Sequence, residues 1–135
     1  MAAEQLIEIA GEADIVLARS AARRLATQLG FSLMDQSRIT TAVSELARNI
    51  VRYATGGNGS IHLKELAGAQ GVGIEVVAED KGPGIPDIDQ AMQQGYSSGS
   101  GLGLGLSGTK RLTDEMEIRS ELGVGTVVIV RKWKR

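Results

Sequence analysis

The sequence predicts an α+β fold, a two-layer sandwich in which a mainly antiparallel, mixed sheet is covered on one face by helices. Two observations support this prediction. Two long segments repeat apolar residues at helical spacing, whereas several shorter segments alternate apolar and polar residues as strands do. Helices combined with mainly antiparallel strands pack as two layers. At 135 residues the chain is long enough for one core, so we expect a single domain over residues 1–135.

Two segments in the first half of the chain have the spacing of amphipathic helices. The first covers residues 15–29, with Asp14 as its N-cap and Gly30 as its stop signal. The second begins at Asp35 and reaches about residue 54. Its apolar stripe consists of Ile39, Val43, Leu46, Ala47, Ile50 and Ala54. The face predicted to turn away from this stripe holds Arg38, Ala42, Glu45, Asn49 and Arg52.

The remaining elements are strands and short helices. Strands are expected at 5–10, 60–66, 72–80, 116–121 and 126–133, and short helices at 88–92 and 104–113. A Gly-Ala-Gln-Gly turn predicts that the second and third strands form a hairpin. Along the third strand Val72, Ile74, Val76 and Ala78 share one face. Asp80 has the same parity, so we expect its carboxylate to point toward the covered side.

Composition excludes several classes of function. The chain has no cysteine and one histidine, which excludes disulfides, thiolate metal sites and cysteine nucleophiles. We interpret His62 as a structural or exposed side chain. The net charge of -1 and the 3% aromatic content argue against nucleic-acid binding. No apolar segment is long enough to span a bilayer and no signal peptide is evident, so we expect a cytoplasmic protein with no membrane partner.

A glycine-rich segment covers residues 95–108. Six of the eighteen glycines lie in it, and they alternate with leucines, which favour burial. Backbone N–H groups in such a segment, followed by a helix N-terminus, are suited to binding an anion, so we interpret it as a phosphate cradle. It matches neither the Walker motif nor a strand-leading G-x-G-x-x-G pattern. The alternative is a mobile loop with a hydrophobic anchor.

Asp80 and the polar pair Glu45 and Asn49 are the other candidates for chemistry. A carboxylate on the covered face is costly unless a donor meets it, and the amino group of adenine is one such donor. The alternative is that Asp80 starts a turn by binding its own backbone two residues on. Glu45 and Asn49 are four residues apart and share one helix face. The alternative for them is a solvated face with a weak Glu–Arg pair.

Together these segments resemble the motifs of the GHKL ATPases, a family that includes histidine kinases, gyrase and heat-shock protein 90. SELARN at 44–49 is similar to the N box of the family, DKGPGI at 80–85 to its first glycine box and GLGLGL at 101–106 to its second. Gly125-Thr126 is similar to its late Gly-Thr pair. The resemblance covers the chain from Asp14 to its end, and it implies the Bergerat ATP-binding fold.

The resemblance also implies roles for individual residues. Glu45 corresponds to the catalytic base, and Asn49 to the ligand of a magnesium ion that bridges the phosphates. Arg52 corresponds to a basic residue at the phosphates, and Tyr53 to a wall of the pocket. The implied ATP-binding residues are Asn49, Arg52, Tyr53, Asp80, Gly82, Gly84, Ile85, Gly101, Leu102, Gly103, Leu104, Gly105, Leu106, Lys110 and Thr126.

The implied flexible ATP lid, residues 95–108, departs from the family pattern because it has no arginine or lysine. Magnesium, Arg52, Lys110 or backbone amides must then neutralise the charge that develops during transfer.

Within this family the sequence most resembles the anti-sigma serine kinases, in particular the switch kinases of the stressosome. The resemblance implies an ATP- and magnesium-dependent serine/threonine kinase. It would phosphorylate STAS-domain scaffold and antagonist proteins in a partner-switching stress response and would activate a PP2C-type phosphatase. The alternative is an anti-sigma factor whose partner binding is gated by ATP.

Two groups of basic residues remain, one at the C-terminus and one on the two predicted helices. We interpret the C-terminal RKWKR as a solvated tail with Trp133 packed down, and partner docking as its alternative. Arg19, Arg23, Arg24 and Arg38 are exposed arginines, with a docking surface as the alternative.

Overall fold

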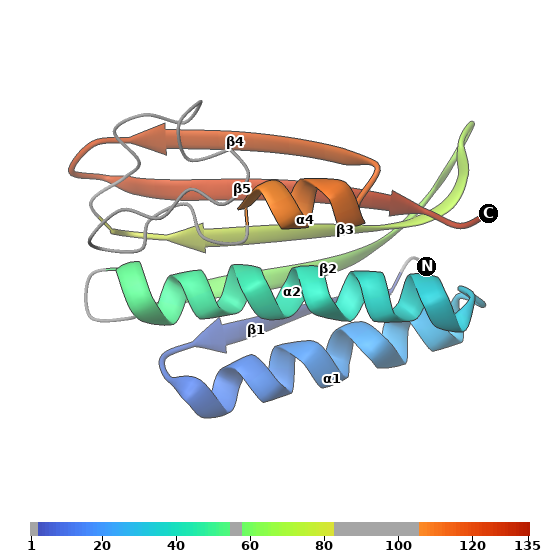
Figure 1. Cartoon of the computed structure of the whole chain (residues 1–135), viewed down its shortest axis with the longest axis horizontal. Coiled ribbons are helices and arrows are strands. Elements are labelled where there is room, and N and C mark those ends of the chain that lie inside the picture. Colours follow the sequence, from blue (N-terminus) through green and yellow to red (C-terminus); the bar gives the residue numbers. More distant parts are fainter. Residues whose placement is uncertain (1–2, 55–57, 83–105) are drawn as a thin grey trace.

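The computed structural model describes residues 3–54, 58–82 and 106–135, which form a five-stranded sheet with helices on one face (Figure 1). The sheet order is β1-β2-β3-β5-β4, and all four of these pairings are antiparallel. The α+β prediction is therefore confirmed. The elements are β1 (Glu4–Ile9), α1 (Glu12–Gln28), α2 (Leu33–Tyr53), β2 (Gly59–Gly68), β3 (Gly71–Asp80), α4 (Leu106–Leu112), β4 (Glu115–Glu121) and β5 (Gly125–Trp133).

In both long helices the N-cap lies three residues before the aspartate that was expected to mark the helix start. The N-cap of α1 is Gly11, and Asp14 instead accepts a hydrogen bond of 2.8 Å from the Ala10 amide. The N-cap of α2 is Ser32, whose hydroxyl accepts a hydrogen bond of 3.1 Å from the Asp35 amide. The predicted N-cap role of Asp14 and the predicted start of the second helix at Asp35 were wrong, because an acidic side chain in the first turn also stabilises a helix N-terminus.

The end of α1 follows the sequence prediction. Gly30 has a φ of +82°, and its amide donates to the Thr27 carbonyl at 3.1 Å. The next amide, of Phe31, donates to the Ala26 carbonyl at 3.0 Å. This paired arrangement ends a helix and turns the chain, so α2 can run back along α1.

The core lies between the sheet and the helices. All members of the predicted α2 stripe are buried, as are Ile74, Val76 and Ala78 on β3. Ala42 was expected on the polar face of α2 but is only 1% exposed. We attribute this burial to α4, which packs against α2 beside the stripe that faces the sheet. The covered surface of α2 is therefore wider than that stripe.

The C-terminal segment is a strand and not a solvated tail. Residues 131–133 complete β5, as the strand predicted at 126–133 required, and Trp133 packs over the backbone of Gly73, as predicted for the indole. Lys132 is 9% exposed, with Nζ at 3.6 Å from one carboxylate oxygen each of Asp35 and Asp114. These partners lie far away in the sequence, which is why local charge density suggested a solvated segment.

Several predictions fall outside the described residues, among them the helix at 88–92 and most of the glycine-rich segment. The helix expected at 104–113 is present over its described part as α4. None of the helices in the described ranges is long and apolar enough to cross a membrane.

Candidate nucleotide site

Four strands contribute one row of small or polar residues at the end of the sheet where α2 finishes (Figure 1). The register pairs Gly59 of β2 with Asp80 of β3, Asp80 with Thr126 of β5, and Thr126 with Ser120 of β4. Asp80 has the parity of the buried residues of β3, so this row lies on the face that the helices cover. The hydroxyl oxygens of Thr126 and Ser120 are 3.1 Å apart. The predicted Asp80 and Thr126 are thereby direct neighbours.

The Asp80 carboxyl is half-buried and forms no ion pair with a lysine or arginine of the described ranges. Its Oδ1 accepts a hydrogen bond of 2.8 Å from the Gly82 amide, which is the contact that the turn interpretation predicted. Burial raises the pKa of the Asp80 carboxyl above its usual value, although hydrogen bonds from the Gly82 and Thr126 amides oppose the shift. Within the described part of the chain no lysine or arginine contributes to that pKa. A carboxylate has lone pairs for about four donors, so the turn leaves Asp80 able to accept from a ligand.

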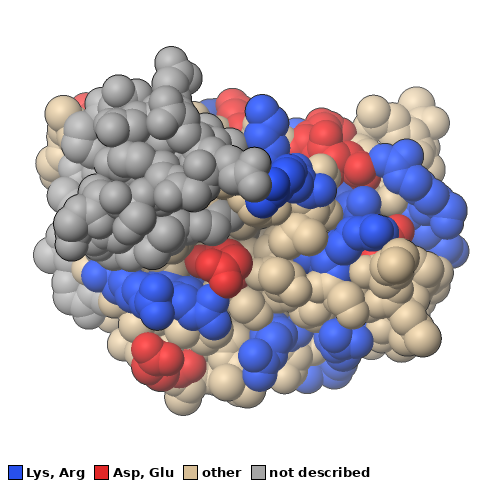
Figure 2. Space-filling model, in the orientation of Figure 1, with Lys and Arg blue, Asp and Glu red and all other residues tan. Residues whose placement is uncertain are grey.

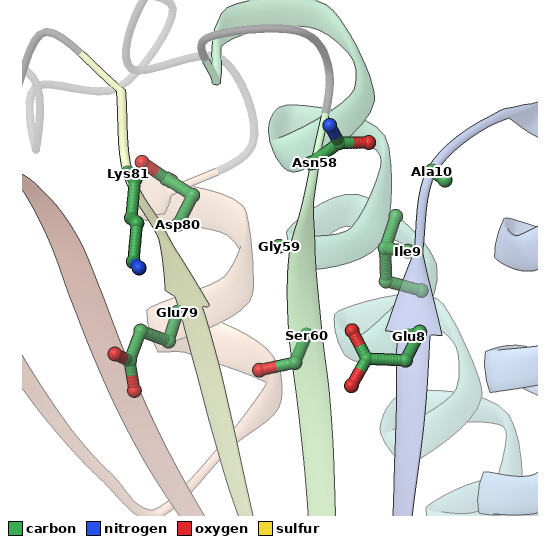
Figure 3. A pocket seen from close by; sticks show the side chains of 9 residues that line it. All are labelled: Glu8, Ile9, Ala10, Asn58, Gly59, Ser60, Glu79, Asp80 and Lys81. Atoms are coloured by element: carbon green, nitrogen blue, oxygen red, sulfur yellow. The ribbon is translucent and has the colours of Figure 1, made fainter.

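Two cavities border Asp80. One, of about 550 Å³, is formed by the ends of β1, β2 and β3 (Figure 3). The other, of about 360 Å³, is formed by β3 and the β4–β5 hairpin. Both are lined by Glu79, Asp80 and Lys81. Cavities of this size are typical of small-ligand sites.

Two glycines make the close packing around Asp80 possible. Gly125 has a φ of +152°, and a Cβ at this position would overlap the carbonyl oxygen of Asp80. A Cβ on Gly59 would overlap the Glu79 carbonyl and lie 2.8 Å from Cγ2 of Ile50. Gly125 belongs to the Gly-Thr pair noted in the sequence, whereas Gly59 was not singled out. The position of Gly59 at the start of a predicted strand could have indicated it, because a glycine in a strand often marks a close approach of another backbone.

The polar face of α2 carries Glu45 and Asn49 as predicted, both half-buried, with Arg52 exposed one turn further on. Glu45 forms an ion pair of 2.5 Å with Arg48, and the two side chains are 31% and 33% exposed. Sequence analysis anticipated a Glu–Arg pair but did not single out Arg48, which the spacing of three residues would have suggested. Arg48 therefore adds a cation beside the predicted catalytic residue.

The remaining predicted residues divide into described and undescribed positions. Leu106 is buried and Lys110 is exposed, both on α4. Thr109, between them, has a buried hydroxyl with no hydrogen-bond partner among the described residues. Gly82 is buried beside Asp80. The side chain of Tyr53 and the positions Gly84, Ile85, Gly101, Leu102, Gly103, Leu104 and Gly105 lie outside the described part.

The donor set on α2 fits a magnesium ion that arrives with phosphates. In the described residues no group of three or more His, Cys, Asp or Glu side chains could hold a metal ion. The available oxygens are the amide of Asn49 and the carboxylate of Glu45, one turn apart. Magnesium commonly keeps several waters and takes only one or two protein ligands beside substrate phosphates, so this set is sufficient.

Comparisons with known proteins agree with this geometry. Residues 34–135 match the family model described as histidine kinase-, DNA gyrase B- and HSP90-like ATPase. The chain is 48% identical over 132 residues to the serine/threonine-protein kinase RsbT of Bacillus subtilis, and the match covers 98% of each protein. It is 32% identical over 120 residues to an anti-sigma F factor of Clostridium beijerinckii, covering 85% of this chain and 82% of that protein.

A solved structure of the RsbU and RsbW domains of a Mycobacterium tuberculosis protein shares the fold. The TM-score is 0.67 at 19% identity, and the match covers 99% of this chain and 32% of the other. The family model covers most of the chain, including β3 with Asp80 and all but the first residue of α2. The chain therefore belongs to the histidine kinase-, DNA gyrase B- and HSP90-like (GHKL) ATPases.

Proposed function

We propose that this protein is an ATP-dependent serine/threonine protein kinase in which Asp80 binds the amino group of adenine. The observation that carries the proposal is the half-buried Asp80 carboxylate, which lies opposite Thr126 and forms no ion pair with a described lysine or arginine. Buried charge without a counter-ion is typical of a site that awaits a ligand. The 48% identity to a serine/threonine-protein kinase supports the reaction class.

The proposed chemistry uses the polar face of α2. The hydroxyl oxygen of a partner serine or threonine attacks the γ-phosphorus, and the bond between that phosphorus and the β–γ bridging oxygen breaks. Glu45 accepts the hydroxyl proton, and ADP leaves with the bridging oxygen. Magnesium, held by Asn49, would neutralise charge on the phosphates when it is bound. Arg48 holds the carboxylate of Glu45 through the ion pair, while Arg52 and Lys110 supply positive charge that residues 95–108 lack.

The proposed partners follow from the relatives. A kinase of this type would phosphorylate STAS-domain scaffold and antagonist proteins of a stressosome in the cytoplasm, and it would activate a PP2C-type phosphatase. The similarity to RsbT supports this assignment. The second candidate function is an anti-sigma factor whose partner binding depends on ATP, and the 32% identity to anti-sigma F factors favours it.

The test compares two variants with labelled ATP, magnesium and a purified STAS-domain protein. Glu45→Gln keeps the size of the side chain, so ATP binding should stay near native while single-turnover transfer falls by roughly 100-fold or more. Asn49→Ala should weaken ATP binding and transfer together. Arg38→Ala, at the other end of the same helix, is the control and should change neither.

The outcomes separate the alternatives. Phosphate on the STAS-domain protein supports the kinase, and stoichiometric capture of a sigma factor without transfer supports the anti-sigma function. Native transfer by Glu45→Gln would show that Glu45 is not the base. Loss of ATP binding as severe as in Asn49→Ala would instead make Glu45 a support of the metal site.

A further inference from the structure

The end of the molecule opposite Asp80 exposes two large apolar side chains. Leu33 is 77% exposed and Met34 is 67% exposed, and they are adjacent in the first turn of α2. Side chains of this size normally gain about 1.5–3 kcal/mol from burial. An adjacent pair so fully exposed is typical of an interaction surface rather than of scattered surface residues.

Basic side chains surround this apolar pair. Arg38 is one helical turn after Met34, and its side chain is 42% exposed. Lys134 reaches the turn that precedes α2, because a Cβ on Gly30 would lie 2.9 Å from its Nζ. Figure 2 shows that lysines and arginines gather at this end of the molecule, where α2 begins and the chain ends. Arg38 is neutralised by its ion pair with Asp35, so we call Leu33, Met34, Lys134 and Arg135 the α2-start patch.

The charges of this region leave a surplus of cations. Asp35 pairs with Arg38 at 2.8 Å, and Asp114 pairs with Arg135 at 2.6 Å. The buried Lys132 lies between these two carboxylates. Lys134 is exposed and forms no ion pair in the described residues. These four cations and two carboxylates have a net charge of +2, although the whole chain carries -1. Glu115, which lines the same hollow as Arg135, is paired with Arg131.

We propose that the α2-start patch docks an acidic amphipathic helix of a partner protein. Apolar side chains at helical spacing would cover Leu33 and Met34, and flanking carboxylates would meet Lys134 and the exposed guanidinium of Arg135. A second copy of this chain does not fit, because it would bring two surfaces of the same positive charge together.

A membrane surface is also a poor fit. Attraction to anionic lipid depends on clusters of about four to eight uncompensated basic residues. Here Asp35 and Asp114 lie within the basic cluster and would repel lipid phosphates. Only two apolar side chains are available for insertion, so a protein helix that can place each carboxylate beside a cation is favoured.

The α2-start patch is separate from the nucleotide site. Leu33 precedes Asn49 by sixteen residues on the same helix, a separation of about 24 Å at 1.5 Å per residue. A docked helix and a bound nucleotide therefore occupy the molecule together. The proposal consequently stands whether or not Glu45 and Asp80 have the roles proposed above.

The test uses the absence of cysteine from the chain. Ser37→Cys, on the exposed surface beside the patch, accepts a single fluorophore, and Ser20→Cys on α1 provides the control position. The probe is a synthetic helical peptide of about 18 residues with leucines at helical spacing and glutamates elsewhere. We expect a saturable signal at position 37 only, with a dissociation constant of roughly 10–100 µM that rises with salt.

Variants locate the binding surface. Leu33→Ser combined with Met34→Ser, and separately Lys134→Glu, should each weaken peptide binding by about tenfold, a difference of about 1.4 kcal/mol. Leu122→Ser, 65% exposed at the β4–β5 turn, and Lys64→Glu, exposed on β2, are the matched controls and should leave it unchanged. Melting temperatures establish that each variant is folded.

Three results would overturn the proposal. One is the absence of saturable binding, and another is equal binding of a peptide in which lysines replace the glutamates. The third is a stronger response to vesicles of anionic lipid than to the peptide, which would assign the patch to a membrane surface. Peptide binding that persists in Asp80→Asn, together with lost ATP binding, would confirm that the two sites are independent.

Discussion

Asp80 and Asp114 lie at opposite ends of the sheet, and their environments shift their acidity in opposite directions. Asp80 closes β3, where burial raises its pKa and backbone amides only partly compensate. Asp114 precedes β4 and is also partly buried, but the Trp133 amide, Arg135 and Lys132 outweigh this burial and hold its pKa below the usual value. Among the residues that the structure describes, no cation pairs with the Asp80 carboxylate, whereas the Asp114 carboxylate is surrounded by donors.

This difference shows how one sheet separates stability from binding. A charge that holds the fold together is most useful when it is fully paired, as at Asp114. A carboxylate that selects a ligand must keep lone pairs free to accept hydrogen bonds from that ligand. At Asp80 the fold therefore tolerates the cost of burying a carboxylate that no described cation pairs with. The end near Asp80 is thus suited to recognition, whereas the network around Asp114 ties β5 to the start of α2.

The largest effect should come from the glycine beside Asp80. Gly125→Ala places a Cβ against the Asp80 carbonyl at a positive φ, so we expect a loss of roughly 3 kcal/mol or more in the free energy of unfolding. Gly123→Ala, at a φ of +78° with open space around it, should cost only about 1 kcal/mol. Urea unfolding of both variants measures the difference. Equal losses would mean that backbone conformation, and not the close approach to Asp80, requires glycine at position 125.

The second effect concerns ligand binding. Asp80→Asn should weaken ATP binding by about 1.5–3 kcal/mol, the usual cost of losing a hydrogen bond to a charged group. The free energy of unfolding of this variant at neutral pH should not fall greatly. The pKa of Asp80 is raised because burial penalises the charged carboxylate, and the neutral amide of asparagine avoids that penalty. Isothermal calorimetry and urea unfolding measure the two quantities. Native ATP affinity in this variant would contradict the assignment of adenine to Asp80.

Much of the fold could be predicted from local pattern. The α2 stripe and the alternation along β3 were correct because burial against a single sheet face imposes a period on each element. The helix starts were misplaced by two or three residues, because an aspartate in the first turn and one at the N-cap stabilise the same helix end. The pairing that places Asp80 opposite Thr126 was anticipated only through the family resemblance.

What could not be predicted depends on contacts between distant parts of the chain. Lys132 belongs to the core because Asp35 and Asp114 meet it there, and no local pattern in the C-terminal segment indicates those partners. The exposure of Leu33 and Met34 is a similar case. Whether these two apolar side chains are buried depends on how α2 packs against α1, and the local sequence does not indicate that packing. The roles of Glu45 and Asn49 in transfer stay predictions.

The third effect sharpens the role of Asp114. Asp114→Asn should lower the free energy of unfolding at neutral pH by about 1–2 kcal/mol, because it removes the acceptor of the Arg135 pair and weakens the bond from the Trp133 amide. Since the pKa of Asp114 is lowered by folding, its contribution is present above the unfolded value of about 4 and is lost as pH falls through the folded one. The free energies of unfolding of the native protein and of Asp114→Asn, measured from neutral to acid pH, should therefore converge as the pH falls. A constant difference would assign the loss to packing rather than to charge.

The smallest effect compares two ion pairs on the same helix. Glu45–Arg48 lies at the nucleotide end of α2 and Asp35–Arg38 at the other, and both join residues three positions apart. Partly exposed pairs of this kind contribute about 0.3–0.5 kcal/mol, so Arg48→Ala and Arg38→Ala should each change stability by no more than that.

If Arg48 serves to orient Glu45, its removal should slow phosphoryl transfer by about twofold, the equivalent of that energy, while Arg38→Ala leaves the rate unchanged. Arg48→Lys should restore most of the rate, and single-turnover assays with a STAS-domain protein measure it. A loss of about tenfold or more in Arg48→Ala would exceed what orientation through an exposed pair can supply, and it would place the guanidinium in contact with the phosphates themselves.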